Sequence, residues 1–156
     1  MRHHVVLIPG FFGFVNLGEL TYFKHVRTHI TEWAKHNGIN VVVHRPRTPP
    51  TAALSVRAHV LHALIQYDIP EGEPIHLIGH SAGGLDARWL TSPTTTLDGD
   101  ASDTVAKRVN TVVCVSSPHR GTPLATLFDS VMGGSLLRLF STLSTCLLYT
   151  SPSPRD

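Results

Sequence analysis

The stretch "IHLIGHSAGGLDARWL", residues 75–90, decides the fold, because one short turn in it joins a strand pattern to a helix pattern. Its first residues form an apolar run that is typical of a buried strand, and from Ser81 to about Leu90 the pattern is helical. Gly79 and Gly83 lie two positions before and after Ser81. This G-x-S-x-G arrangement predicts a sharp turn that holds the serine side chain clear of the sheet.

Apolar runs and helical patterns alternate along the chain on both sides of this stretch. We predict strands at residues 4–9, 39–45, 75–79 and 109–116. Two amphipathic helices lie between the first three strands, with apolar stripes formed by Leu20, Phe23, Val26, Ile30 and Trp33 in one and by Leu54, Ala58, Leu61, Leu64 and Ile65 in the other. The alternation predicts an α/β fold, in which helices cover both faces of a parallel sheet.

The last predicted strand has an apolar edge that a further strand would normally cover. If the run 109–116 is the final strand, its apolar edge has no neighbour, and such edges promote aggregation. Cys114 lies inside this run, and we expect it to be a buried, inert thiol. The polar segment 91–103 is predicted to be a surface loop.

Composition places the chain among soluble globular proteins. It has 156 residues, of which 42% are hydrophobic and 15% charged, and its net charge is +2 with histidine neutral. This balance favours neither nucleic acid nor an acidic partner. The apolar runs are too short to span a bilayer, and the N-terminus lacks a signal-peptide core. The expected location is therefore cytoplasmic by default.

The C-terminal residues 146–156, "CLLYTSPSPRD", form an unusual tail. Their sequence resembles, in full, the translation of a transposase adapter that is used in sequencing libraries. We therefore expect the tail to be non-biological and the reading frame to be interrupted near Thr145, so that residues 1–145 are the N-terminal part of a single domain. A disordered terminus rich in proline and serine would explain the composition of the tail, but it would not explain why the tail matches the translated adapter residue by residue.

A nucleophilic serine needs N–H donors for the oxyanion of its tetrahedral intermediate. The backbone N–H of Ala82, at the start of a helix, is the first candidate. The second is the N–H of Phe11, in the loop "PGFFGF", residues 9–14, where Gly10 allows the backbone to turn inward. Taken alone, this loop also fits a plain glycine turn, and Ser81 also fits an ordinary helix N-cap.

Three blocks of the sequence resemble the bacterial triacylglycerol lipases of the α/β-hydrolase superfamily: "VVLIPGFFGF" (5–14), the stretch 75–90 and "VSSPHRGTPLATLF" (115–128). The resemblance implies a partial α/β-hydrolase fold whose later strands are missing, and a serine nucleophile that cleaves esters of lipids or long acyl chains. Two departures are Pro9, where the family usually has histidine, and Ala82, where it usually has glutamine.

The triad partners of the serine are expected to be absent from this chain. In this fold the acid and then the histidine follow the nucleophile, on loops after the later strands. His119 is the best candidate for the base within this chain. The resemblance, however, implies a structural role for the block "SPHRG" (117–121), in which His119 and Arg120 support the region around the nucleophile. The side chain of His80 is expected to point away from Ser81. We therefore expect little or no turnover from the chain as it stands.

Other polar residues have simpler interpretations. Asp86 and Arg88 are expected to form a buried bracing pair, and Asp129 to be a surface carboxylate. His25 with His29, and His59 with His62, have the spacing of metal ligands on helices, but without clustered cysteines or carboxylates we expect solvated helix faces and no metal. No cofactor is expected, although a structural calcium ion of the resembling lipases would lie in the missing part.

Several alternatives stay open at this level. The segment 121–145 fits either a mobile lid, which would favour contact with lipid interfaces, or a core helix. Two other functions also fit the sequence. An acyltransferase would form the same acyl-enzyme and pass the acyl group to an alcohol, and a non-catalytic binding protein would have the hydrolase fold without the activity. Lipid or acyl-ester substrates are the expected partners, and nucleic acid is not.

Overall fold

The computed structural model describes residues 1–10, 19–49, 52–93, 95 and 105–123. Strands and helices alternate in them as predicted, and the observed bounds lie close to the expected ones. The elements are β1 (Arg2–Ile8), α1 (Glu19–His36), β2 (Asn40–His44), α2 (Leu54–Asp68), β3 (Ile75–His80), α3 (Ala82–Thr91) and β4 (Val109–Val115).

The strands form one parallel sheet in the order β2-β1-β3-β4. Because all the strands run in the same direction, their carboxyl ends meet at one edge of the sheet. β3 ends there at His80, and α3 begins at Ala82. The turn around Ser81 therefore lies at the edge where open α/β sheets place their ligand sites.

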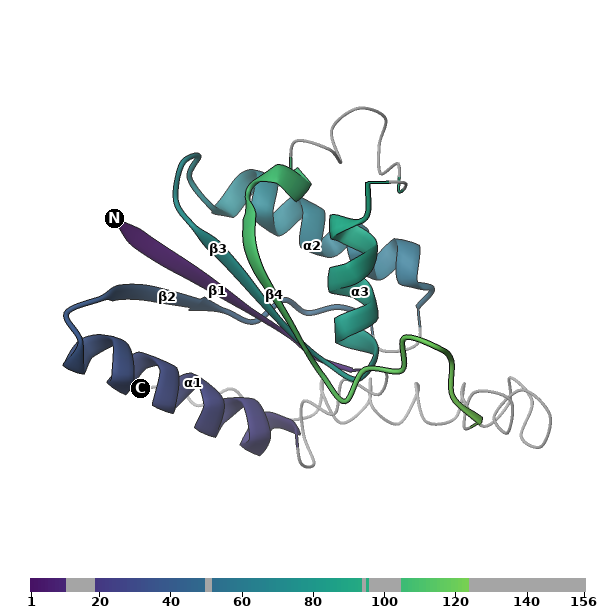
Figure 1. The fold of residues 1–156 in the computed structure, drawn as a ribbon, viewed down its shortest axis with the longest axis horizontal. Helices are drawn as coiled ribbons and strands as arrows, with labels where there is room; N and C mark the ends of the chain where they lie inside the picture. Colours follow the sequence, from purple (N-terminus) through teal and green to yellow (C-terminus); the bar gives the residue numbers. More distant parts are fainter. Residues whose placement is uncertain (11–18, 50–51, 94, 96–104, 124–156) are drawn as a thin grey trace, which may run out of the picture.

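Helices cover both faces of the sheet, as Figure 1 shows: α1 lies on one face, and α2 and α3 lie on the other. Side chains of β1 alternate between two apolar clusters. Val5 and Leu7 pack with Phe23 of α1, whereas Val6 and Ile8 pack with residues of α2 and α3. A strand that is buried on both faces needs apolar residues at every position, which explains the continuous run in β1. The predicted α/β class with a parallel sheet is confirmed.

β4 lies at the edge of the sheet and pairs with β3. Its side chains are largely solvent-exposed: Val112 is 38% exposed and Val113 43%. Cys114 is exposed as well. The prediction that Cys114 is buried is wrong, because an edge strand without cover does not bury even an apolar sequence.

Two predictions for helical residues also need correction. Trp33 was placed in the packed stripe of α1 but is 62% exposed, and the neighbouring Ala34 is buried instead. His62 was expected on a solvated face of α2 but is buried. The periodicity therefore located both helices correctly, but it placed the edges of their buried faces wrongly.

Several predicted features lie outside the described residues. They include most of the segment 91–103, Asp129, the segment 121–145 beyond residue 123, and the tail 146–156. Within the described part of the chain, no helix combines the length and apolar character needed to cross a membrane.

Candidate active site

Ser81 has an unusual backbone conformation. Its φ is 53° and its ψ is −125°, although it is not a glycine. Residues with side chains rarely adopt positive φ, and such strain is concentrated at functional sites. Two hydrogen bonds hold the turn: the Ser81 N–H donates to the Val115 carbonyl (2.9 Å), and the Gly84 N–H donates to the Ser81 carbonyl (3.1 Å). The Ser81 side chain forms no capping hydrogen bond, which argues against an ordinary N-cap.

The glycines around Ser81 permit close backbone contacts. A Cβ on Gly79 would overlap the carbonyl of Gly83, and a Cβ on Gly83 would overlap the Ile8 carbonyl and lie 2.7 Å from the Pro9 carbonyl. The first turn of α3 therefore lies directly on the end of β1. Glycine at these two positions is a steric requirement of the turn, as the pentapeptide predicts.

Gly10, which follows β1, lies beside Ser81. A Cβ on Gly10 would lie 2.9 Å from Ser81 Cβ and 3.3 Å from Ser81 Oγ. Phe11, the predicted second oxyanion donor, lies outside the described residues. Ala82, the predicted first donor, is the first residue of α3. Its N–H is thus one of the initial N–H groups that have no acceptor within the helix, at the end of the helix dipole that favours negative charge.

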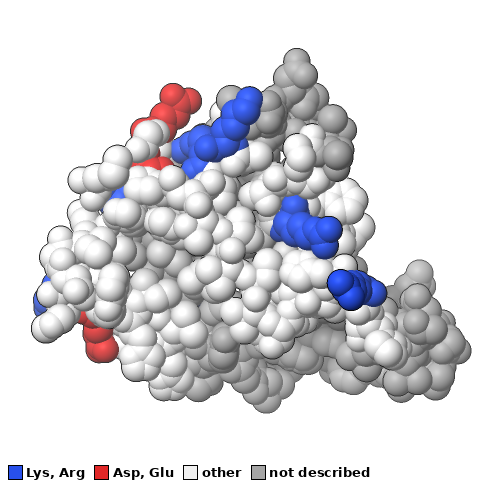
Figure 2. Space-filling model, in the orientation of Figure 1, with Lys and Arg blue, Asp and Glu red and all other residues white. Residues whose placement is uncertain are grey.

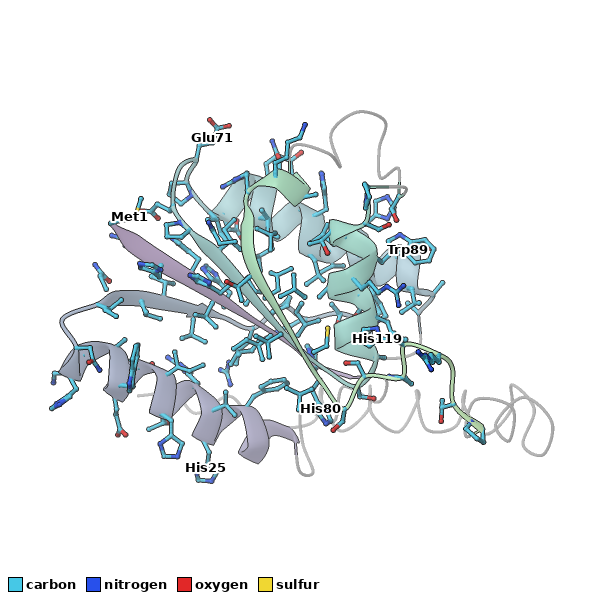
Figure 3. The ribbon with its side chains drawn as sticks, viewed as in Figure 1. Met1, His25, Glu71, His80, Trp89 and His119 are labelled. Atoms are coloured by element: carbon cyan, nitrogen blue, oxygen red, sulfur yellow. The ribbon has the colours of Figure 1, made fainter. Side chains whose placement is uncertain are left out.

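The block after β4 packs against α3. A Cβ on Gly84 would overlap Ser117 Oγ and lie 2.8 Å from Ser117 Cβ. His119 and Arg120, two and three residues after Ser117, are exposed. Figure 3 shows His80 and His119 at the end of the sheet where α3 begins, whereas Met1 and Glu71 lie toward the opposite end.

Asp86 is fully buried, and its partner is Arg57 of α2, which is 1% exposed. Arg57 Nε donates to both carboxylate oxygens (3.1 and 2.9 Å), and Nη2 donates to Oδ2 (2.7 Å). Burial raises the pKa of Asp86, and the hydrogen bonds and charge of Arg57 oppose this rise. The predicted Asp86–Arg88 pair is therefore wrong: Arg88 is exposed, and the true partner lies on another helix.

Sequence reasoning missed Arg57 altogether. No motif contains it, and a single arginine in an amphipathic helix is usually a surface residue. The one available signal is its place within the buried stripe of α2, directly before Ala58. Arg57 also donates through Nη1 to the Pro49 carbonyl (3.0 Å) and through Nη2 to the Pro9 carbonyl (2.8 Å).

Two other features lie away from Ser81. An apolar groove of about 620 Å³ lies between α1 and the sheet, with Val5, Trp33, Val41 and His76 in its lining. The last residue of β3 in its lining is Ile78, so the groove does not include the turn at Ser81. His25 and His29 are exposed on α1, and the described residues contain no group of three histidine, cysteine or acidic side chains arranged to hold a metal ion.

Comparison with known proteins agrees with this fold. The crystal structure of a metagenomic carboxyl esterase superposes with a TM-score of 0.59 at 20% sequence identity, over 83% of this chain and 37% of that one. The chain thus spans little more than a third of the length of that esterase. No curated protein matches the chain significantly. The model of the alpha/beta hydrolase family matches residues 5–153, and the chain therefore belongs to the alpha/beta hydrolase family.

Proposed function

We propose that this protein is a serine hydrolase that cleaves carboxylic esters through an acyl-enzyme on Ser81. The observation that carries the proposal is the conformation of Ser81, at φ 53° between β3 and α3, with the Gly10 backbone against its side chain. Membership of the alpha/beta hydrolase family and the structural likeness to a carboxyl esterase support a hydrolase of this kind.

The proposed reaction has two steps. Ser81 Oγ attacks the ester carbonyl, the bond to the alcohol breaks, and the Oγ proton passes through a histidine to the departing alcohol. Water then attacks the acyl-enzyme, gives a proton to the same histidine and releases the acid while Ser81 regains its proton. The backbone N–H groups of Ala82 and Phe11 would stabilise the oxyanion in both steps.

We propose that the histidine and its acidic partner belong to a further part of the protein. Residues 1–145 would then be the N-terminal part of a single hydrolase domain, and residues 146–156 would not contribute to it. The exposed apolar side chains of β4 support this proposal, because a further strand and its helix would cover them.

Esters of lipids or long-chain acyl groups are the proposed substrates. This choice follows from the resemblance of "GHSAGGLDAR" (79–88) and "SPHRG" (117–121) to triacylglycerol lipases. A series of p-nitrophenyl esters of increasing acyl length tests it directly, since kcat/KM should rise toward the longer chains. A steady fall beyond short acyl chains would contradict the lipid preference and leave the esterase proposal standing.

Replacement of Ser81 tests the nucleophile. In the complete protein, Ser81→Ala should lower kcat for p-nitrophenyl esters by about 10³-fold or more. Ser116→Ala is a matched control, because Ser116 also has positive φ (50°), at the end of the neighbouring strand β4. It should keep the activity, whereas the 156-residue chain should show little or no turnover.

Equal loss in both variants, or none in Ser81→Ala, would overturn the proposed role of Ser81. Normal turnover by the 156-residue chain would overturn the proposed location of the acid and base. Product analysis with and without an acceptor alcohol separates hydrolysis from acyl transfer.

A further inference from the structure

The buried Arg57 guanidinium joins three parts of the molecule. It forms a two-pronged contact with Asp86 of α3, and it donates to the Pro49 carbonyl before α2 and to the Pro9 carbonyl after β1. The planar fork of arginine makes this set of contacts in fixed directions, which the single ammonium of lysine does not reproduce. Arg57 therefore links the Pro9 carbonyl to Asp86 of α3.

The Pro9 carbonyl lies close to the proposed nucleophile. It is adjacent to Gly83 in the first turn of α3, and the next residue, Gly10, contacts Ser81. The Pro9–Gly10 peptide is trans, so its N–H points opposite to the carbonyl that Arg57 holds. A donor on that carbonyl thus fixes the orientation of the whole peptide beside Ser81.

Stability alone is a poor explanation for this arrangement. Replacing a buried ion pair by well-packed apolar residues is often neutral or stabilising, so such pairs are weak evidence of a stabilising role. Burial raises the pKa of Asp86, which means that desolvation opposes its charged form. The Pro9 and Pro49 carbonyls give Arg57 a role that an apolar residue would not fill.

We propose that Arg57 is a positioning residue of the hydrolase site: with Asp86 as its anchor, it fixes the Pro9–Gly10 peptide against Ser81. This inference rests on the proposed function. In this role the Arg57–Asp86 pair keeps the Pro9–Gly10 peptide at a constant distance from the nucleophile. The loop that begins there is the one proposed to supply the second oxyanion donor.

The test compares Arg57→Lys and Arg57→Met with Arg108→Met in the complete protein. Arg108 is a matched control, because it also donates to three backbone carbonyls, those of Ile65, Ile69 and Pro70, but near the opposite edge of the sheet from Ser81. Both Arg57 variants should lower kcat by about 10- to 100-fold, since small displacements of catalytic groups have effects of this size. KM should change by less than about threefold, and Arg108→Met should keep kcat within about twofold.

Amide hydrogen exchange at Gly10 provides a readout that does not depend on activity. Both Arg57 variants should exchange this amide about tenfold faster while the amides of α3 keep their protection, because only the peptide is released. Where Arg57→Met fails to fold, the double variant Arg57→Met with Asp86→Asn removes both buried charges and gives the same comparison.

The outcomes separate this inference from the proposed function. A kcat like that of Arg108→Met, or a lower kcat with unchanged Gly10 exchange, would overturn the positioning role of Arg57. If the unchanged protein shows no Ser81-dependent hydrolysis, the proposed function has failed. In that case the rate of amide hydrogen exchange at Gly10 alone tests whether Arg57 holds the Pro9–Gly10 peptide. An unchanged rate in both Arg57 variants would overturn the positioning role as well.

Discussion

Gly83 and Gly84 occupy helical positions at which backbone contact outweighs helix propensity. In an exposed helix, alanine is more favourable than glycine by up to about 1 kcal/mol. In α3 a Cβ at these positions would overlap the Ile8 carbonyl and Ser117 Oγ, respectively. The two glycines therefore allow α3 to lie directly against the ends of β1 and β4, which brings the elements around Ser81 together.

Replacement of Gly83 by alanine tests which effect is larger. Propensity alone predicts stabilisation by up to about 1 kcal/mol, whereas overpacking against the Ile8 and Pro9 carbonyls predicts destabilisation by about 1–3 kcal/mol. We expect destabilisation, because both contacts are with backbone atoms that do not rotate away. Urea denaturation of the variant and the unchanged chain measures the sign, and a higher midpoint for Gly83→Ala would refute the steric explanation.

Among the elements, β1 is joined to its neighbours by two histidine pairs on opposite faces of the sheet. His4 Nδ1 and His44 Nε2 of β2 are 2.8 Å apart, and His3 Nδ1 and His76 Nε2 of β3 are 3.0 Å apart, with the rings stacked in both pairs. Each contact is an N–H···N hydrogen bond, which needs one ring nitrogen without a proton. Protonation of both rings of a pair would remove that acceptor and place two imidazolium charges in contact. His4 Nε2 also lies 2.5 Å from Glu73 Oε2, so among the described residues His4 has an acidic partner that His3 lacks in its contact with His76.

These pairs should make stability depend on pH. Burial and then the partner histidine lower the pKa of His44, against an opposing charge from Asp68, and burial and His3 lower the pKa of His76. The unfolded chain then binds more protons than the folded chain below its ordinary histidine pKa of about 6.5. This contribution to stability is present above that pH and is lost as the pH falls below it.

Denaturation at about pH 7.5, 6.5 and 5.5 measures this dependence as the change in unfolding free energy. His44→Gln and His76→Gln should each reduce the loss on acidification, because glutamine keeps a hydrogen-bonding group that does not titrate. His25→Gln, on the exposed surface of α1, is the control and should not alter the slope. An unchanged slope in both test variants would exclude these two histidines as its source.

The elements themselves were predictable from the sequence, because apolar period and turn residues are local signals. The strands, the helices and the turn at Ser81 agree with their predictions. Contacts between elements were not predictable in the same way. Asp86 finds its partner in Arg57, on the preceding helix, and no spacing rule connects them. The exposure of Cys114 follows from the position of β4 at the edge of the sheet, and the sequence of β4 alone does not specify that position.

At the scale of the whole molecule, the sheet is covered unequally. α2 and α3 bury the larger apolar cluster, whereas α1 leaves the groove beside Trp33 and His76 open. β4 adds exposed valines at the edge next to β3. The face shown in Figure 2 is mostly uncharged, with only scattered lysine, arginine and acidic side chains. Parallel sheets are normally covered on both faces, so these surfaces suit contact with further protein.

The 156-residue chain should therefore self-associate through the β4 edge. Val113→Lys should increase the monomer fraction, because a charge on an edge strand opposes pairing with another strand. Val56→Lys is the matched control: Val56 is similarly exposed, at 49%, but lies on α2. Size-exclusion chromatography with light scattering over a concentration series measures the effect, with circular dichroism to verify folding. A monomeric unchanged chain at every concentration, or equal effects of both lysines, would show that the β4 edge does not mediate association.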